Sequence, residues 1–175
     1  MSWDGSGGVI MSWGERRNGN GDIYAQRIDA DGSIHTGWQI DGQPICTNSS
    51  SLAEPDIVSD GSGGAVITWR DYRNGNHDIY AQRINADGSI HASWTPDGEP
   101  ICRASGYQCA PRITSDGLGG AIITWQDNRS GNYDIYAQRI DADGSIHSGW
   151  ATDGEPICTD ASGLDRSEER RVGKE

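Results

Sequence analysis

Phenylalanine is absent from the 175 residues, and no apolar run reaches the length of about 18 residues that a membrane-spanning helix needs. Positive charge is scarce as well: Lys and Arg number 14 against 26 Asp and Glu, for a net charge of −12. The missing apolar run argues against membrane insertion. An acidic surface repels phosphate backbones, so we expect neither a membrane nor a nucleic acid as partner.

Recognisable catalytic signatures are missing too. The sequence has no G-x-S-x-G elbow, no H-E-x-x-H zinc motif, no pair of CxxC motifs and no phosphate-binding loop. No window has the periodicity of an amphipathic helix, and no secretory signal peptide is visible. We therefore expect no catalytic residues, no metal ligands and no enzyme activity in this chain.

Glycine and tryptophan are abundant instead, at 25 and 7 residues. The segment D-G-x-G-G begins at Asp4, Asp60 and Asp116, which are 56 residues apart. Each copy continues with a tryptophan, then D-I-Y-A-Q-R-I, A-D-G-S-I-H and D-G-x-P-I-C. The chain is therefore three copies of one 56-residue unit, without insertion or deletion between them.

The middle copy predicts four short strands per unit. They are residues 55–59, 65–71, 78–85 and 99–102, separated by turns rich in Gly, Asn and Asp. Four antiparallel strands in one such unit match a β-propeller blade, whose middle strands are covered on both faces and need not alternate. The competing architecture is an open β-solenoid, whose coils are usually shorter. We expect an all-β fold of three four-stranded antiparallel propeller blades.

The string P-x-I-x-S-D-G-x-G-G-A-x-I-T-W-x-D-x-R-x-G-N-x-D-I-Y-A-Q-R-I resembles the tandem blade repeats of large secreted bacterial β-propeller proteins. Its layout is similar to NHL-type and YWTD-type blades, and the resemblance covers residues 4 to about 163. The resemblance implies an extracellular protein with a binding or scaffold role. It is specific for the repeat and weak for function, since one fold serves many functions.

The repeat divides the chain into blade repeats 4–59, 60–115 and 116–164 (incomplete) and an Arg- and Glu-rich tail, 165–175. Residues 1–3 stand where the first strand is expected, so we expect the first repeat to lack it. Three blades do not close a ring, because propellers have roughly four to eight. The chain is interpreted as a fragment whose parent supplies the remaining blades; the alternative is a homodimer that closes a six-bladed ring.

The residues that recur most faithfully are expected to be structural. The W-x-[DE]-x-R segment could pair an acid with a base, but a catalytic site is needed once, whereas this segment occurs in every copy. We interpret it, with D-I-Y-A-Q-R, as an ion pair under an indole that fixes each blade. The expected structural residues are Trp13, Trp69, Trp125, Asp71, Arg73, Asp127, Arg129, Asp78, Tyr80 and Arg83.

Ligand contacts are expected where the copies differ, in residues 70–77, 103–109 and 126–133. His77 and Tyr133 occupy one variable turn position there. A second candidate set is one tryptophan per copy in the loop before the last strand: Trp38, Trp94 and Trp150. An exposed indole in such a loop can stack on a sugar ring. The alternative is that each indole folds back onto its own outer strand.

Three remaining features have structural interpretations. Cys102 and Cys109 flank a short loop, so a disulfide is geometrically conceivable, although spacing alone does not establish it. The D-A-D-G-S segments half-resemble a calcium loop but lack its later acidic ligands, so we interpret them as hairpin turns and expect no cofactor. The repeated histidines are interpreted as structural or solvated rather than as ligands of one metal: His35, His91 and His147.

We predict a non-catalytic repeat module that binds a glycan or a protein ligand, or serves as a scaffold, within a secreted bacterial protein. The alternative is a fragment of a propeller enzyme, such as a glycoside hydrolase, whose catalytic carboxylates lie outside this chain. A rigid spacer without a ligand is a third interpretation. The near-identity of the copies favours the first over the enzyme, because a repeat that carries a catalytic site usually diverges.

Overall fold

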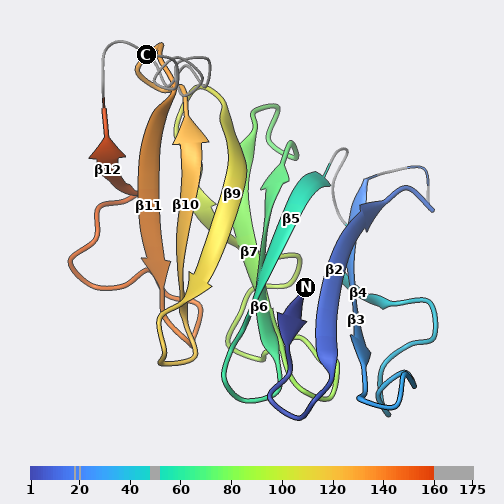
Figure 1. Cartoon of the computed structure of the whole chain (residues 1–175). Coiled ribbons are helices and arrows are strands. Elements are labelled where there is room, and N and C mark those ends of the chain that lie inside the picture. The colour runs from blue at the N-terminus through green and yellow to red at the C-terminus, as the bar shows by residue number, and fades with distance from the viewer. Residues whose placement is uncertain (18, 20, 48–51, 160–175) are drawn as a thin grey trace, which may run out of the picture.

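The computed structural model describes residues 1–17, 19, 21–47 and 52–159. The described residues form no helix; their twelve strands make three four-stranded antiparallel sheets (Figure 1). Sheet 1 consists of β1 (Ser2–Trp3), β2 (Val9–Glu15), β3 (Asp22–Ile28) and β4 (Gln43–Cys46). Sheet 2 consists of β5 (Leu52–Ser59), β6 (Ala65–Asp71), β7 (Asp78–Ile84) and β8 (Glu99–Cys102). Sheet 3 consists of β9 (Gln108–Ser115), β10 (Ala121–Asp127), β11 (Asp134–Ile140) and β12 (Glu155–Cys158). The prediction of an all-β chain with four antiparallel strands per repeat is confirmed.

The sheets are out of phase with the sequence repeats. Strand β5 ends the first sequence repeat, 4–59, but pairs with β6 and so belongs to sheet 2. The expectation that the first repeat lacks its first strand is wrong: the two-residue β1 pairs with β2, Ser2 opposite Ile10. The predicted tail, 165–175, lies outside the described residues.

The first strand of each sheet is longer than its sequence predicts. Both β5 and β9 contain a register shift, and Glu54 and Ala110 lie there with φ of 58° and 52°. A bulge of this kind extends the strand beyond the proline at which the predicted strand begins, so that two further residues pair in each case, Leu52 and Ala53 in β5 and Gln108 and Cys109 in β9. The carboxylate of Glu54 accepts a hydrogen bond of 2.8 Å from the backbone NH of Ala110, which links the two bulges.

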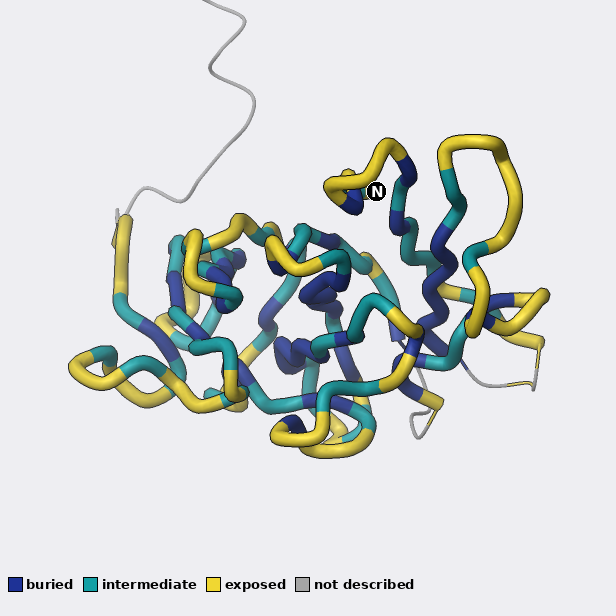
Figure 2. Tube along the Cα trace, turned by 90° about the horizontal axis from the view of Figure 1, so that it is seen from below, coloured by how far each residue is buried: buried dark blue, intermediate teal, exposed yellow. Residues whose placement is uncertain are grey.

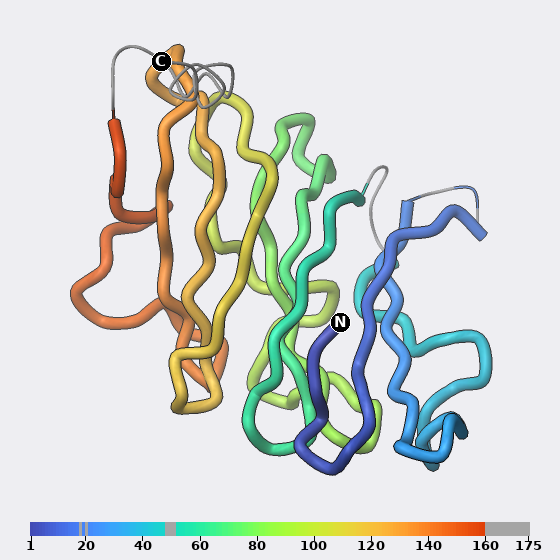
Figure 3. Tube along the Cα trace, viewed as in Figure 1, coloured from blue at the N-terminus to red at the C-terminus, as the bar shows by residue number. Residues whose placement is uncertain are grey.

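The sheets pack face to face in chain order, and each joint between neighbours encloses a hydrophobic core. Strand β5 contacts β2 and β3, and β9 contacts β5, β6 and β7 (Figure 3). On β6, Ile67 and Trp69 belong to the core shared with sheet 1, whereas Val66 belongs to the core shared with sheet 3. Successive side chains of a strand point to opposite faces, so a sheet that is covered twice needs apolar residues at every position. Buried residues follow the strands and exposed ones the loops (Figure 2).

The D-G-x-G-G turns are closed by their aspartate. Asp60 is 4% exposed and accepts hydrogen bonds from the backbone NH groups of Ser62 and Gly64, at 2.8 and 2.9 Å. Its second oxygen accepts from Arg83 of the D-I-Y-A-Q-R strand at 2.8 Å. Two separate sequence motifs are therefore parts of one hydrogen-bonded unit, and Asp4 with Arg27 repeats it at 2.8 Å in sheet 1.

Candidate functional site

The W-x-[DE]-x-R segment forms one polar unit in each sheet, which is buried in sheets 2 and 3 and partly exposed in sheet 1. In sheet 2 the indole NH of Trp69 donates to Asp71 at 3.0 Å, and Nε of Arg73 donates to the same carboxylate at 2.9 Å. The guanidinium lies 4.1 Å from the centre of the Tyr80 ring and donates to the carbonyl of Asp97 at 2.8 Å. The corresponding residues of sheet 3 make the same contacts.

This unit also links each sheet to the one before it. Nη2 of Arg73 lies 3.2 Å from the sulfur of Cys46 in sheet 1, and Arg129 lies 3.2 Å from the sulfur of Cys102 in sheet 2. The guanidinium of Arg73 is therefore held by a carboxylate, a carbonyl, a sulfur and an aromatic ring. These contacts are those of a fixing device that each repeat needs.

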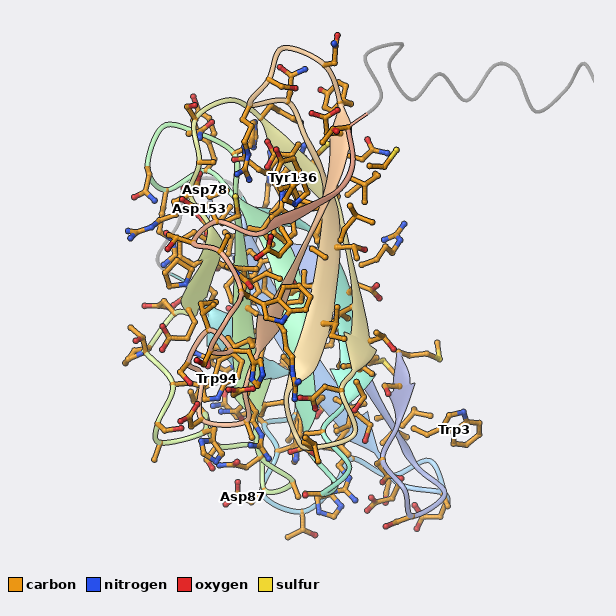
Figure 4. The ribbon with its side chains drawn as sticks, turned by 90° about the vertical axis from the view of Figure 1, so that its left-hand side faces the viewer. Trp3, Asp78, Asp87, Trp94, Tyr136 and Asp153 are labelled. Carbon is orange, nitrogen blue, oxygen red and sulfur yellow. The ribbon has the colours of Figure 1, made fainter. Side chains whose placement is uncertain are left out.

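The loop tryptophans do not present their indoles as the sugar-stacking interpretation requires. Trp38 is 6% exposed and Trp94 is 3% exposed. Each indole NH donates at 3.0 Å to a carbonyl of the following sheet, that of Ala86 for Trp38 and that of Ala142 for Trp94. Figure 4 shows Trp94 among the ribbons rather than at the rim. The sugar-stacking interpretation therefore does not fit the burial of these two residues. Each indole shares a core with the isoleucine and cysteine of its own last strand, and its NH in addition bonds to the next repeat.

A glycine in the A-D-G-S turn of the following repeat leaves room for each indole. An added Cβ at Gly88 would lie 3.3 Å from the Trp38 ring, and one at Gly144 would lie 3.2 Å from the Trp94 ring. Glycine at this position leaves a flat backbone surface on which an indole rests. Trp150, the third member, is half-buried and belongs to sheet 3.

The cysteines and the D-A-D-G-S turns form neither a disulfide nor a metal site among the described residues. Cys102 and Cys109 are free thiols, so the conceivable disulfide is not formed. Among the described residues, no group of three or more His, Cys, Asp or Glu side chains is arranged to hold a metal ion. In the D-A-D-G-S turn, Asp31 accepts from the backbone NH of Ser33 at 2.9 Å, and the equivalent aspartates do the same.

The repeated histidines bond locally. Nδ1 of His35 lies 2.7 Å from Asp29, and Nδ1 of His147 lies 2.8 Å from Asp141. His91 lies 3.0 Å from the hydroxyl of Ser93, because Asn85 replaces the aspartate in that repeat. Each histidine thus closes its own turn.

One aromatic cluster gathers residues that differ between the copies. The ring of His77 lies 4.7 Å from that of Tyr72 and 4.4 Å from that of Tyr107, measured between centroids. Tyr133 continues the row at 6.4 Å from Tyr107, with the two rings at 90°. Tyr72 and Tyr133 are each 40% exposed, so the two ends of the row are open to a ligand. Arg70 donates to the hydroxyl of Tyr107.

The loops that carry this row are joined by backbone hydrogen bonds. The NH of Gln108 donates to the carbonyl of His77 at 3.0 Å, and the NH of Asn128 donates to that of Tyr107 at 2.9 Å. The side chain of Asn76 donates to the carbonyl of Ala104 at 2.8 Å. The row therefore spans the joint between sheets 2 and 3 on a fixed scaffold. Burial, with a contribution from Arg70, lowers the pKa of His77.

A polar hollow of about 480 Å³ is lined by the turn that carries His77, by the start of the loop that carries Tyr107 and by the loop before β12. Its lining residues are Asn74, Asn76, Asp78, Arg103, Thr152 and Asp153. Figure 4 shows Asp78 and Asp153 close together at this place. Asp78 is 2% exposed, and burial raises its pKa, with Asp153 adding to the effect. Carboxylates, carboxamides and a guanidinium here offer both donors and acceptors beside the aromatic row.

The corresponding place between sheets 1 and 2 is different. Gly14, Gly21 and Ala53 stand where Arg70, His77 and Cys109 stand one repeat later. These smaller residues leave a hollow of about 280 Å³ there, which is also lined by Leu52, Pro55 and charged side chains. The aromatic row is therefore specific to one joint, in contrast to the device built on Trp69.

The sequence located this site in part. His77 and Tyr133 were predicted from their variability, and the structure brings both into one row. Tyr72 and Tyr107 lie inside the predicted variable ranges but were not singled out, because nothing in the sequence shows that a turn of one repeat meets the first strand of the next. The sequence does show that both tyrosines are unrepeated. Tyr72 corresponds to Arg16 and Asn128 in the other copies, and Tyr107 corresponds to Ser51. This difference between the copies was the signal by which the two tyrosines could have been found.

No protein-family model matches the chain, and no curated protein matches it by sequence. No helix among the described residues has the length and apolar character needed to cross a membrane.

Proposed function

We propose that the chain is a non-catalytic binding module built from three β-propeller blades, of the secreted bacterial type that its repeat resembles, and that it binds a glycan at the joint between sheets 2 and 3. The observation that carries the proposal is the row from Tyr72 to Tyr133, which is confined to one joint and exposed at both ends. A sugar has an apolar C–H face and a rim of hydroxyls. Aromatic rings beside a hollow of amides and carboxylates complement both.

The charge of the module narrows the ligand class. A net charge of −12 disfavours anionic chains by long-range repulsion. The hollow places Asp78 and Asp153 beside a single arginine, Arg103, so its local balance is also acidic. A neutral oligosaccharide is therefore the ligand that these side chains favour.

The proposal is tested on an array of neutral oligosaccharides, followed by calorimetric titration of the best one. Replacing Tyr133 by Ala is expected to weaken binding about tenfold, since one ring contact contributes about 1 kcal/mol. Tyr133 is 40% exposed, so the variant keeps its fold, which circular dichroism checks. The control is Leu118→Ala, which removes a side chain 74% exposed in the β9–β10 turn and should leave binding unchanged.

Three results would overturn the proposal. Absence of binding to every neutral glycan, or equal affinity of the Tyr133 variant, would remove the aromatic row as the site. Shortening of the bound oligosaccharide during incubation, seen by mass spectrometry, would show that the module is catalytic and would favour the glycoside hydrolase alternative.

A further inference from the structure

The two joints between sheets are built from the same set of contacts. At the first, Nη1 of Arg27 donates to the carbonyl of Ala86 at 3.2 Å; at the second, Arg83 donates to that of Ala142 at 2.9 Å. The loop tryptophan of the earlier sheet donates to the same carbonyl in each case. After these contacts we call the side of the joint on the earlier sheet its donor half and the side on the later sheet its acceptor half, although Arg73 and Arg129 donate in the opposite direction, to Cys46 and Cys102.

A third contact repeats at the other end of the strands. The backbone NH of Thr47 donates to the carboxylate of Asp97 at 3.1 Å, and that of Arg103 donates to Asp153 at 2.7 Å. Together with the arginine–cysteine contact, polar bonds thus flank the apolar core of each joint at both ends. The joint has a fixed direction, because its two halves differ.

The outer face of sheet 3 carries a donor half that no described residue covers. Ile157 is 60% exposed, whereas its counterparts Ile45 and Ile101 are 3% and 2% exposed. Cys158 is exposed, whereas the other two cysteines at this repeat position are buried. The side chain of Arg139 is 22% exposed against 11% for Arg83, and within the described residues no next-sheet carbonyl accepts from it.

The outer face of sheet 1 carries the matching acceptor half. Trp13 is half-buried, whereas Trp69 and Trp125 are 0% and 1% exposed. Ile40 is 81% exposed, whereas its counterpart Pro96 lines a hollow together with Ile45 and Cys46 of the preceding sheet. Ala30, the counterpart of Ala86 in the acceptor turn, is exposed as well.

We propose that these two faces bind each other, so that the outer face of sheet 3 in one copy of this chain receives the outer face of sheet 1 in a second copy. Head-to-tail contacts between unlike faces either close into a ring or continue as a filament. Two copies bring six sheets together, within the range of about four to eight in which propeller rings close, whereas three copies would bring nine. The occupant is therefore a single second copy, held through two equivalent joints.

Light scattering after size-exclusion chromatography tests the proposal across protein concentrations from about 1 to 100 μM. The full chain of 18.8 kDa is expected to elute at twice this mass at high concentration. Ile157→Glu buries a charge in the new joint and is expected to give the single-chain mass. Its strand should stay folded, because the side chain is exposed in the single chain. Leu118→Glu is the matched control and should keep the doubled mass.

A second measurement does not depend on any variant. The thiol of Cys158 is exposed in one chain and would lie under an arginine of the second copy, as Cys46 lies under Arg73. Its alkylation, followed by mass spectrometry, is expected to slow at least tenfold as the mass doubles. A single-chain mass up to 100 μM, a series of larger masses without a closed species, or a doubled mass with Cys158 still reactive would each overturn the proposal. None of these results bears on glycan binding at the aromatic row.

Discussion

At the scale of single residues, the acid–arginine pair of the W-x-[DE]-x-R segment is buried in sheet 3 and partly exposed in sheet 1, so the effect of burial on one contact can be measured within one chain. The side chain of Asp127 is fully buried and accepts hydrogen bonds from Trp125 and Arg129. Its counterpart Glu15, with Arg17, is 26% exposed because no described residue covers that face of sheet 1. An ion pair contributes more when its partners are desolvated, and removing one partner then leaves a buried charge.

We predict that Asp127→Asn lowers the free energy of unfolding by about 3 kcal/mol at pH 7, because Arg129 loses its buried partner. Glu15→Gln should cost below about 1 kcal/mol when measured on single chains, because that pair is partly solvated. Urea unfolding followed by tryptophan fluorescence measures both. Equal costs for the two variants would show that burial does not set the strength of this contact.

The difference in unfolding free energy between the wild-type chain and Asp127→Asn is expected to depend on pH through the pKa of Asp127. Burial raises this pKa, but the hydrogen bonds from Arg129, Trp125 and Gln108 together lower it below its usual value. A carboxyl whose pKa is depressed on folding stabilises the fold above the unfolded pKa of about 3.9, and this stabilisation is lost as the pH falls through the folded pKa. The gap between wild type and Asp127→Asn should therefore be constant above pH 5 and shrink below pH 4.

At the scale of strands and turns, sequence reasoning succeeds where the interaction is local. Strand β6 has the bounds expected from its β-branched run, and β8 begins and ends where D-G-x-P-I-C predicts. The prediction is too short for β5 and β9, because the bulges at Glu54 and Ala110 depend on pairing with a second strand. It also does not reveal the hydrogen bonds of Trp38 and Trp94, because their acceptors belong to another repeat and leave no trace in the adjacent sequence.

The D-G-x-P-I-C turn has a steric requirement that can be tested. Gly98 has φ of 106°, and an added Cβ would lie 2.6 Å from the ring of Trp69. Gly98→Ala is expected to destabilise the chain by about 2–4 kcal/mol, from backbone strain and overpacking together. Gly75→Ala, at φ 79° with nothing within 4 Å, should cost only about 1 kcal/mol. Thermal and urea unfolding would measure this difference, and equal losses would contradict the role of the indole.

At the scale of the whole molecule, the stack is a one-dimensional array in which each sheet contacts only its neighbours. Sheet 2 is covered on both faces, by the two cores that contain Trp69 and Trp125. Stability in such arrays is close to a sum of unit and joint contributions, so the outer units open first. A uniform repeat in the sequence is therefore expected to have non-uniform stability.

Hydrogen exchange measured by mass spectrometry tests this on the Ile157→Glu variant, which keeps the outer faces uncovered. Amides of β6 and β7 are expected to exchange at least tenfold more slowly than those of β2, β3, β10 and β11. In the wild-type chain at high concentration the difference should shrink, because a second copy would cover both outer faces. Uniform exchange in the variant would show that the three sheets unfold as one unit.

The identity of the two joints has a consequence for how such a chain can change in length. Because both joints use the same contacts, a duplication or loss of one whole 56-residue unit recreates a joint that already exists. A length change by an odd number of residues within a strand reverses which side chains face each neighbour and disrupts two cores. The D-I-Y-A-Q-R segment is identical in the three units, so units aligned on it keep the same register. Recombination within such a gene would thus change the number of units while preserving every interface between them.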